Sequence, residues 1–368
     1  MKAQKPPMGF NTWNRFLDVR DFPQVEQITH DSVVALAKAM VDSGMKDAGY
    51  EYFVMDDGFQ GYTRDHRGRL QGHARRFRPG IPALIEEVKS LGLKMGIYSV
   101  PGRFTCFEQY QDYHGLGNGS LDREEIDAIS FAEWGIDFLK YDWCRAHIND
   151  GLDAPTAFRK MADALAKHAP DIVFSISEYG LFKSHEWAPE FTNMWRTTDD
   201  LFANWKSILG TIDQQIGLES YSGPGRWNDP DMLQIGNHAL TDSENRAHMI
   251  MWAILNAPLM AGNDLVTMTD KVRDILCHRG LIAVNQDWGG RQGKLIRAYG
   301  ELQVWEKPMS NGSTALAYLN RGEVAIKVRA TDDAPAATSV RDVWSSDSAG
   351  AAEVVEVEPH GAILLITQ

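Results

Sequence analysis

The sequence predicts an α/β fold, namely a (β/α)8 TIM barrel followed by a C-terminal antiparallel β-sandwich. From residue 30 to about 282, short apolar, β-branched or aromatic runs alternate with longer segments of helical period, which is typical of repeated βα units. After residue 293 the pattern changes to short alternating runs between Gly, Asn, Asp and Pro turns, which is typical of antiparallel strands. We therefore expect a barrel domain in residues 1–283 and a sandwich domain in residues 284–368.

Eight candidate strands account for the barrel. They are residues 8–13, 51–57, 94–100, 136–143, 171–178, 192–199, 226–233 and 258–264. Segments of helical period lie between them at residues 31–45, 82–92, 121–135, 154–169 and 243–257. An open doubly wound sheet is the alternative, but it normally has a Gly-rich phosphate turn after an early strand. Neither G-x-G-x-x-G nor a P-loop occurs, so the count of eight favours a closed barrel.

The C-terminal region supplies the strands of the sandwich. They are expected in the runs LQVWEK, TALAYLN, VAIKVRA, VVEVE and AILLIT. Residues 330–339, ATDDAPAATS, are expected to form an exposed loop.

Composition bounds the class of protein. The chain has 368 residues, 43% of them hydrophobic and 24% charged, which is typical of a soluble globular protein. A formal net charge of −13 argues against nucleic acid as a partner and favours a neutral substrate. No apolar run is long enough to span a membrane, and residues 1–10 contain no signal segment. We expect a cytoplasmic protein, or a secreted or periplasmic one if a signal has been removed.

The cysteines and histidines give no indication of a metal. Three cysteines are too few for a disulfide scaffold and have no Cys-x-x-Cys spacing, so each is expected to be a small buried residue. Histidine is nearly absent from the predicted strand ends. No metal site and no cofactor are expected.

Acidic residues follow the predicted strands, at the edge that holds the active site in TIM barrels. They are Asp56, Asp57, Asp142, Glu178, Asp199, Asp200 and Asp231. A rim dense in carboxylates suits a transition state that carries positive charge, as in glycoside cleavage, and would also suit divalent metals. The metal interpretation is weakened by cations and aromatic residues on the same rim, because cations hold carboxylates ionised and aromatic faces stack on sugars. These are Lys140, Arg196, Trp13, Trp143, Trp195 and Trp227.

The motifs at these strand ends resemble glycoside hydrolase family 27, which holds α-galactosidases and α-N-acetylgalactosaminidases. The resemblance runs almost end to end. It includes PPMGFNTWN (6–14), FVMDDGF (53–59), GIYS (96–99), FLKYDWC (138–144), WRTTDD (195–200), GRWNDPDMLQIG (225–236), NAPLMAGNDL (256–265) and AVNQDWGGRQG (283–293).

The resemblance implies a retaining double displacement with two catalytic carboxylates. In K-Y-D-x-C the family nucleophile is the Asp, hence Asp142, and Lys140 two residues earlier contacts sugar hydroxyls. In R-x-x-x-D the last residue is the general acid/base, so Asp200 is chosen over Asp199. Arg196 is expected to bind the sugar near C2.

The resemblance also implies the sugar pocket. Asp56 and Asp57 are expected to bind the 4- and 6-hydroxyls of galactose, Trp13 to form an apolar wall and Tyr98 to approach the nucleophile. Asp231 and Met232 are expected to line the pocket beside the acid/base. Cys106 and Cys144 match the family's pocket disulfide, which replaces the expectation of free thiols for that pair, whereas Cys277 stays unpaired.

The segment 177–180 concerns the C2 substituent of the sugar, because Ser-Glu-Tyr-Gly aligns with a family Cys-Glu-Trp-Gly. Glu178 and the bulky Tyr179 favour a 2-hydroxyl over an N-acetyl group. The resemblance therefore predicts an α-galactosidase that releases terminal α-D-galactose from an oligosaccharide or glycoconjugate. Its alternatives are an α-N-acetylgalactosaminidase, a β-L-arabinopyranosidase, a dextran-type hydrolase and a catalytically silent sugar-binding barrel. No nucleic-acid or membrane partner is expected, and a homo-oligomer is left open.

Overall fold

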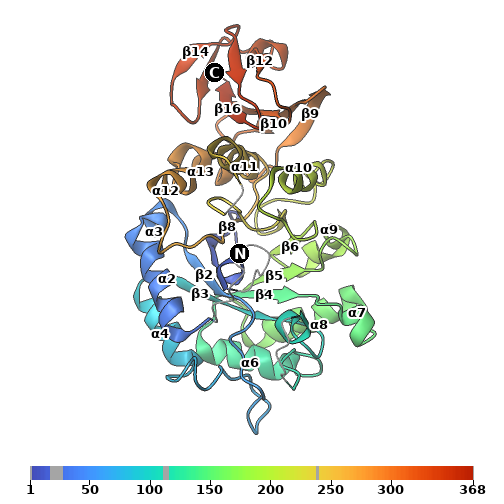
Figure 1. The fold of residues 1–368 in the computed structure, drawn as a ribbon. Coiled ribbons are helices and arrows are strands. Elements are labelled where there is room, and N and C mark those ends of the chain that lie inside the picture. Colours follow the sequence, from blue (N-terminus) through green and yellow to red (C-terminus); the bar gives the residue numbers. More distant parts are fainter. Residues whose placement is uncertain (1, 17–27, 111–115, 238–239, 368) are drawn as a thin grey trace. The chain divides into compact units, whose positions relative to one another are not determined.

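The computed structural model describes residues 2–16, 28–110, 116–237 and 240–367 (Figure 1). Eight strands form one sheet in the order β7-β6-β5-β4-β3-β2-β1-β8, and each lies inside one of the eight segments predicted as barrel strands. They are β1 (Met8–Asn11), β2 (Tyr52–Met55), β3 (Lys94–Ser99), β4 (Phe138–Asp142), β5 (Val173–Ser177), β6 (Met194–Arg196), β7 (Trp227–Asp229) and β8 (Leu259–Ala261).

The strand pairs from β1 to β6 are parallel and each pair follows chain order, which is the topology of repeated βα units. Nearly all residues of these strands are buried, because the inside of the sheet is filled by side chains and the outside is covered by helices. Figure 1 shows α2, α4, α6 and α8 around β2, β3 and β4.

The helices include the five that the periodicity predicts. The helical elements are α1 (Trp13–Phe16), α2 (His30–Asp42), α3 (Met45–Ala48), α4 (Ile81–Ser90), α5 (Cys106–Tyr110), α6 (Glu124–Trp134), α7 (Ala146–Asn149), α8 (Ala154–His168), α9 (Ser184–Trp187), η1 (Ala188–Glu190), α10 (Trp205–Asp213), α11 (Asp242–Ile254), α12 (Asp270–Leu276) and α13 (Arg279–Asn285). Of the helices that were not predicted, α10 and α12 begin at N-caps whose side chains, Asn204 and Thr269, accept a backbone N–H.

The C-terminal strands form a six-stranded antiparallel sheet, β14-β13-β16-β11-β10-β9, and a two-stranded sheet, β12-β15. They are β9 (Lys294–Tyr299), β10 (Leu302–Pro308), β11 (Thr314–Asn320), β12 (Ile326–Val328), β13 (Ser339–Asp342), β14 (Ser348–Gly350), β15 (Val355–Val357) and β16 (Ala362–Thr367). Val304 and Tyr318 of the large sheet share one core with Val328 and Val357 of the small sheet. The prediction of a barrel followed by an antiparallel sandwich is confirmed.

The segment 330–339 departs from the prediction of an exposed loop. It begins with a 3-10 turn, η2 (Ala330–Asp332), and Ala330 is 1% exposed within the core of the sandwich. Because Ala330 is small and is followed by polar residues in the sequence, the pattern did not indicate that it fills part of the core.

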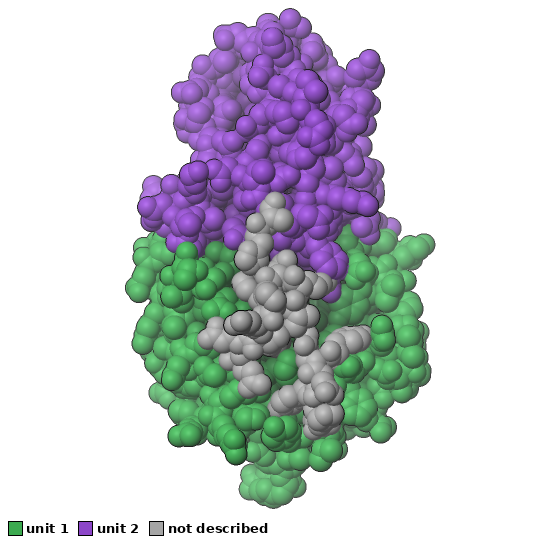
Figure 2. Space-filling model, viewed as in Figure 1, with its two compact units in different colours: residues 1–3, 7–199, 260–267 green, residues 4–6, 200–259, 268–368 purple. Residues whose placement is uncertain are grey.

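The chain divides into two compact units that do not follow chain order (Figure 2). Unit 1 holds residues 1–3, 7–199 and 260–267, and unit 2 holds residues 4–6, 200–259 and 268–368. Within unit 2, α11 is buried over most of its length and packs against β10, β11 and β16. The domain boundary between residues 283 and 284 stays a prediction. Within the described ranges, no helix has the length and apolarity needed to cross a membrane.

A buried ion pair in unit 1 joins the loop after β2 to α6. The Arg64 guanidinium contacts the Asp127 carboxylate at 2.5 Å and 2.8 Å, and the side chains are 6% and 0% exposed. The same guanidinium donates to the backbone carbonyls of Gly68, Asn118 and Gly119. This one side chain therefore holds three chain segments together.

We expect Arg64→Met to lower the free energy of unfolding by about 3–5 kcal/mol, because it leaves the Asp127 carboxylate buried without its cation. Urea denaturation of the variant measures this change. Arg67→Met is the matched control, because Arg67 is an exposed arginine of the same loop, and it should change the stability by less than about 0.5 kcal/mol. Equal effects of the two substitutions would contradict the structural role of Arg64.

Candidate active site

The C-terminal ends of β1 to β5 bring together most of the residues that the sequence predicted to bind sugar. Asp56 and Asp57 follow β2, Asp142 is the last residue of β4, and Glu178 and Tyr179 follow β5. Because neighbouring parallel strands end at the same edge of a sheet, residues far apart in the chain become neighbours in space.

Lys140 lies between two of the carboxylates. Its Nζ donates to Asp56 Oδ2 at 2.7 Å and lies 3.5 Å from Asp142 Oδ2. Residues 140 and 142 point to the same face of β4 because side chains alternate along a strand. Burial strengthens the attraction between these charges, since the side chains of Asp56, Asp142 and Lys140 are 0%, 9% and 17% exposed.

Two aromatic rings lie beside Lys140. Its ammonium lies 5.8 Å from the ring centroid of Trp13 and 5.5 Å from that of Tyr98. Burial, followed by the negative charges of Asp57 and Asp142, raises the pKa of Tyr98 well above its ordinary value, so the phenol keeps its proton. The site thus combines anionic oxygens, one central cation and apolar ring surface.

Asp57 faces the loop that follows β3. Its Oδ2 accepts the N–H of Phe107 at 2.6 Å and its Oδ1 accepts the N–H of Gly58 at 2.8 Å. Desolvation by burial raises the pKa of Asp57 to about 7, despite these hydrogen bonds. The carboxylate therefore fixes the loop, and its contact with a galactose hydroxyl stays a prediction.

This raised pKa predicts a pH dependence of stability. In the folded protein Asp57 binds its proton more tightly than in the unfolded chain, where the ordinary pKa is 3.8. Its contribution to the free energy of unfolding, on the order of a few kcal/mol, is therefore complete below about pH 4 and is lost as the pH rises to about 7. Urea midpoints between these pH values should fall more steeply for the wild type than for Asp57→Asn. Parallel pH profiles of the two proteins would contradict the assignment.

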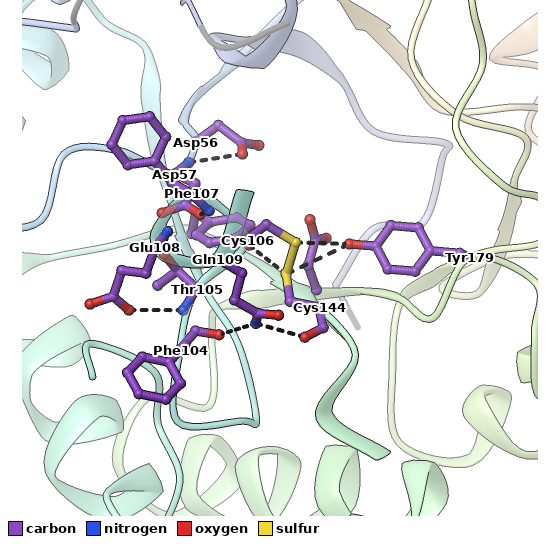
Figure 3. Close-up of a disulfide and its surroundings, with 12 residues drawn as sticks. Asp56, Asp57, Phe104, Thr105, Cys106, Phe107, Glu108, Gln109, Cys144 and Tyr179 are labelled. Carbon is purple, nitrogen blue, oxygen red and sulfur yellow. Dashed lines mark hydrogen bonds between the residues drawn. A yellow bond between two sulfur atoms is a disulfide. The ribbon is translucent and has the colours of Figure 1, made fainter. Parts of the chain in front are cut away.

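A disulfide between Cys106 and Cys144 links the loop after β3 to the end of β4, as the family resemblance implied (Figure 3). One oxygen of the Asp142 carboxylate lies within 4.8 Å of both sulfur atoms. Tyr98 Oη lies 3.1 Å from Cys144 Sγ, and Tyr179 Oη lies 3.3 Å from Cys106 Sγ. Because both sulfurs are bonded to each other, they do not offer thiolates to a metal ion. The expectation from cysteine spacing alone, of buried free thiols, was wrong for this pair; Cys277 is free, as predicted.

Glu178 holds the loop after β5 rather than projecting from it. Its carboxylate accepts the backbone N–H groups of Phe182 at 2.5 Å and Ser184 at 3.0 Å, and burial raises its pKa. The curled loop places Tyr179 in a left-handed conformation with φ of 61°, and its hydroxyl points at the disulfide (Figure 3). A direct contact between Glu178 and the sugar stays a prediction.

Arg196 ends β6 and is 5% exposed. Its Nη2 donates to the carbonyl of Thr198 at 3.2 Å, and its own carbonyl accepts the hydroxyl of Ser184 at 2.7 Å. The end of β6 is thereby joined to the loop that Glu178 holds. Recognition of the sugar by Arg196 stays a prediction.

The predicted acid/base and its neighbours belong to unit 2. Asp200 is partly exposed. The residue after it, Leu201, donates its backbone N–H to Asp231 Oδ2 at 2.8 Å. Asp231 Oδ1 accepts the N–H of Met232 at 2.7 Å, and the Asp231 carbonyl accepts the indole N–H of Trp252 at 2.8 Å. Asp231 therefore fixes the segment that carries Asp200. Met232, which was predicted to line the pocket, is partly exposed.

Sequence reasoning missed three residues that support this site. Asn11 donates to Asp56 Oδ2 at 2.6 Å and accepts the N–H of Trp13 at 2.8 Å, and its place at the end of β1 could have indicated it. Gln109 donates to the carbonyl of Cys144 at 2.8 Å, and Phe107 binds Asp57. Nothing in the sequence pattern indicates these last two contacts, because they depend on the path of the loop after β3.

Known proteins match almost the whole length of this chain. The profile of the family described as "Alpha galactosidase A" matches residues 5–287, and that of the "Alpha galactosidase C-terminal beta sandwich domain" matches residues 299–367. Alpha-galactosidase A of Cellvibrio japonicus is 37% identical over 99% of this chain and 92% of its own length. Alpha-galactosidase 2 of Arabidopsis thaliana is 38% identical over 97% of this chain and 88% of its own length.

Solved structures show the same fold. The crystal structure of alpha-galactosidase I from Mortierella vinacea superposes with a TM-score of 0.88 at 29% identity, covering 100% of this chain and 97% of that one. The sequence matches extend over both the barrel and the sandwich. The chain therefore belongs to the alpha-galactosidase family, glycoside hydrolase family 27.

Proposed function

We propose that this protein releases terminal α-D-galactose from galactose-containing oligosaccharides or glycoconjugates, with net retention at C1. The observation that carries the proposal is the Asp142 carboxylate at the end of β4, within 3.5 Å of the Lys140 ammonium and beside the disulfide. This environment suits a nucleophile that must stay ionised and face a sugar carbon carrying positive charge. Relatives that share 37–38% of their residues with this chain are named alpha-galactosidases.

The proposed reaction has two steps. In the first step Asp142 attacks C1 while Asp200 gives its proton to the departing glycosidic oxygen, which leaves a galactosyl ester on Asp142. In the second step the Asp200 carboxylate takes a proton from water as the water oxygen attacks C1 and the ester bond breaks. Two inversions give α-galactose, and both carboxyl groups return to their starting states.

Specificity for a 2-hydroxyl is proposed to come from Tyr179. Its ring is held by a curled loop whose backbone N–H groups bind Glu178, and its hydroxyl lies against the disulfide. A bulky side chain in a fixed conformation leaves less room for an acetamido group than for a hydroxyl. Asp56, held by Lys140 and Asn11, and Asp57 are proposed to accept the 4- and 6-hydroxyls of galactose.

Initial hydrolysis rates on three nitrophenyl glycosides test this function. They are the α-D-galactopyranoside, the α-N-acetylgalactosaminide and the β-L-arabinopyranoside, with Asp142→Asn as the blank. Galactoside turnover that dominates and vanishes in the variant supports both the activity and the specificity. Dominant turnover of the N-acetylgalactosaminide would refute the Tyr179 argument, whereas dominant turnover of the arabinopyranoside, which lacks C6, would refute the roles of Asp56 and Asp57. If the wild type hydrolyses none of the three glycosides, the proposed activity is refuted.

A further inference from the structure

A pocket outside the proposed active site lies on the loop between β2 and α4, drawn in blue in Figure 1. Its volume is about 380 Å³, and the side chains that line it include Tyr62, Thr63, Gln71, His73 and Arg75. The loop contains an antiparallel bridge between Gln60 and Gly72, with the Gly61 N–H donating to the Gln71 carbonyl at 2.8 Å. The pocket is therefore built on a hydrogen-bonded hairpin, so its walls are held before any ligand binds.

One wall of the pocket is aromatic. Tyr62 is 57% exposed, and its ring lies 5.4 Å from the His73 ring at an interplanar angle of 62°. The edge-on contact with His73 restrains the tyrosine side chain and leaves much of the ring accessible. Exposed aromatic faces of this kind stack on the apolar faces of sugar rings.

The loop that carries the pocket also has a concentration of positive charge. Residues 61–78 contain six arginines and one aspartate, although the whole chain carries a formal net charge of −13. Arg64 and Arg69 pair with Asp127 and Glu133, so the structure of the loop accounts for them. Arg76 donates to the carbonyl of Ile28.

Arg75 differs from these three arginines. It is exposed and lines the pocket, and among the residues that the structure describes no carboxylate forms an ion pair with its guanidinium. Burial, and then the charges of Arg76 and Arg75, lower the pKa of His73, so the imidazole is neutral near pH 7. The positive charge available to a ligand in this pocket therefore comes from Arg75.

We propose that this pocket is an accessory binding site for an anionic saccharide, which stacks a sugar ring on Tyr62 and pairs its carboxylate or phosphate ester with Arg75. The planar guanidinium suits two parallel hydrogen bonds to either group. Thr63 and Gln71 supply the donors and acceptors that sugar hydroxyls need. A short ligand is favoured over a long polyanion, because the net charge of the protein repels the latter.

Calorimetric titration of the full chain tests the site, with trigalacturonate as the carboxylate probe and galactose 6-phosphate as the phosphate probe. Galactose is present at saturating concentration to occupy the proposed active site. We expect at least one probe to bind, and Arg75→Gln and Tyr62→Ser each to weaken that binding by at least about tenfold. Arg78→Gln, which removes an exposed arginine of the same segment outside the pocket lining, should leave the binding unchanged.

Several outcomes would overturn the proposal. They are no binding of either probe in the presence of galactose, unchanged binding in Arg75→Gln, and equal binding of a neutral trisaccharide without galactose, such as maltotriose. Equal loss of binding in Arg78→Gln would show attraction to the basic loop as a whole and would overturn it too. Hydrolysis of nitrophenyl α-galactoside should be unchanged in Arg75→Gln and Tyr62→Ser, so failure of this site is distinguishable from failure of the proposed hydrolase.

Discussion

Replacement of Asp142 by Asn is expected to lower the turnover of nitrophenyl α-D-galactopyranoside by at least about 10⁴-fold, because an amide cannot form the galactosyl ester. The substitution keeps the size of a side chain that is only 9% exposed and lies 3.5 Å from Lys140 Nζ. Asp137→Asn is the matched control, since Asp137 lies just before β4 and pairs with Lys89. That variant should keep the wild-type rate.

Chemical rescue separates loss of the nucleophile from misfolding. In Asp142→Gly, azide should enter the space left by the carboxylate, attack C1 directly and give β-galactosyl azide by a single inversion. An inactive variant that azide does not rescue, although its disulfide and fold are intact, would argue against a nucleophile at position 142. Full activity of Asp142→Asn would rule it out.

Replacement of Asp200 by Ala is expected to lower the rate by about 10²–10⁴-fold on substrates such as melibiose, whose leaving sugar needs a proton. The loss in the first step should be much smaller for nitrophenyl galactoside, because nitrophenolate departs without protonation. Azide should then give α-galactosyl azide, since Asp142 still forms the ester and azide replaces the activated water. The size of the leaving-group effect measures the role of Asp200 as an acid.

Asp199→Asn is the control for this assignment, because the sequence offers two adjacent carboxylates at this position. Asp199 is exposed, whereas Asp200 is partly buried and is followed by Leu201, whose N–H is bound by Asp231. We expect Asp199→Asn to keep most of the activity on both substrates. A reversal, in which Asp199 is essential and Asp200 dispensable, would refute the alignment of R-x-x-x-D.

Strands such as β2, β3 and β4 could be predicted because they are short runs rich in apolar residues. The short strand β7, Trp-Asn-Asp, was less regular and was needed to complete the count of eight. Lys140 and Asp142 are two residues apart on one strand and therefore share a face, and the structure places Lys140 Nζ 3.5 Å from Asp142 Oδ2. The ends of β2 and β4 also predicted that Asp56 and Asp142 gather, and both lie beside Lys140. Strand patterns and side-chain alternation can be read from a few neighbouring residues, which is why the sequence predicted them.

The partners of those acids could not be predicted in the same way. The N–H of Phe107 binds Asp57 across 50 positions of the chain, and Arg64 binds Asp127 across 63. Glu178, expected to meet the sugar, binds its own loop because the backbone N–H groups of Phe182 and Ser184 turn back toward it. Such contacts depend on loop conformation, which turns and tertiary packing determine together. The disulfide likewise followed from the family resemblance and not from the cysteine spacing.

The most direct test of the central claim is to trap the galactosyl ester with 5-fluoro-α-D-galactosyl fluoride and map the label by peptide mass spectrometry. The ring fluorine slows both steps by destabilising positive charge at C1, and the fluoride leaving group keeps the first step faster than the second. We predict one galactosyl label, attached to Asp142 and absent from Asp142→Asn. A label on another carboxylate, or inverted product without any label, would contradict the account.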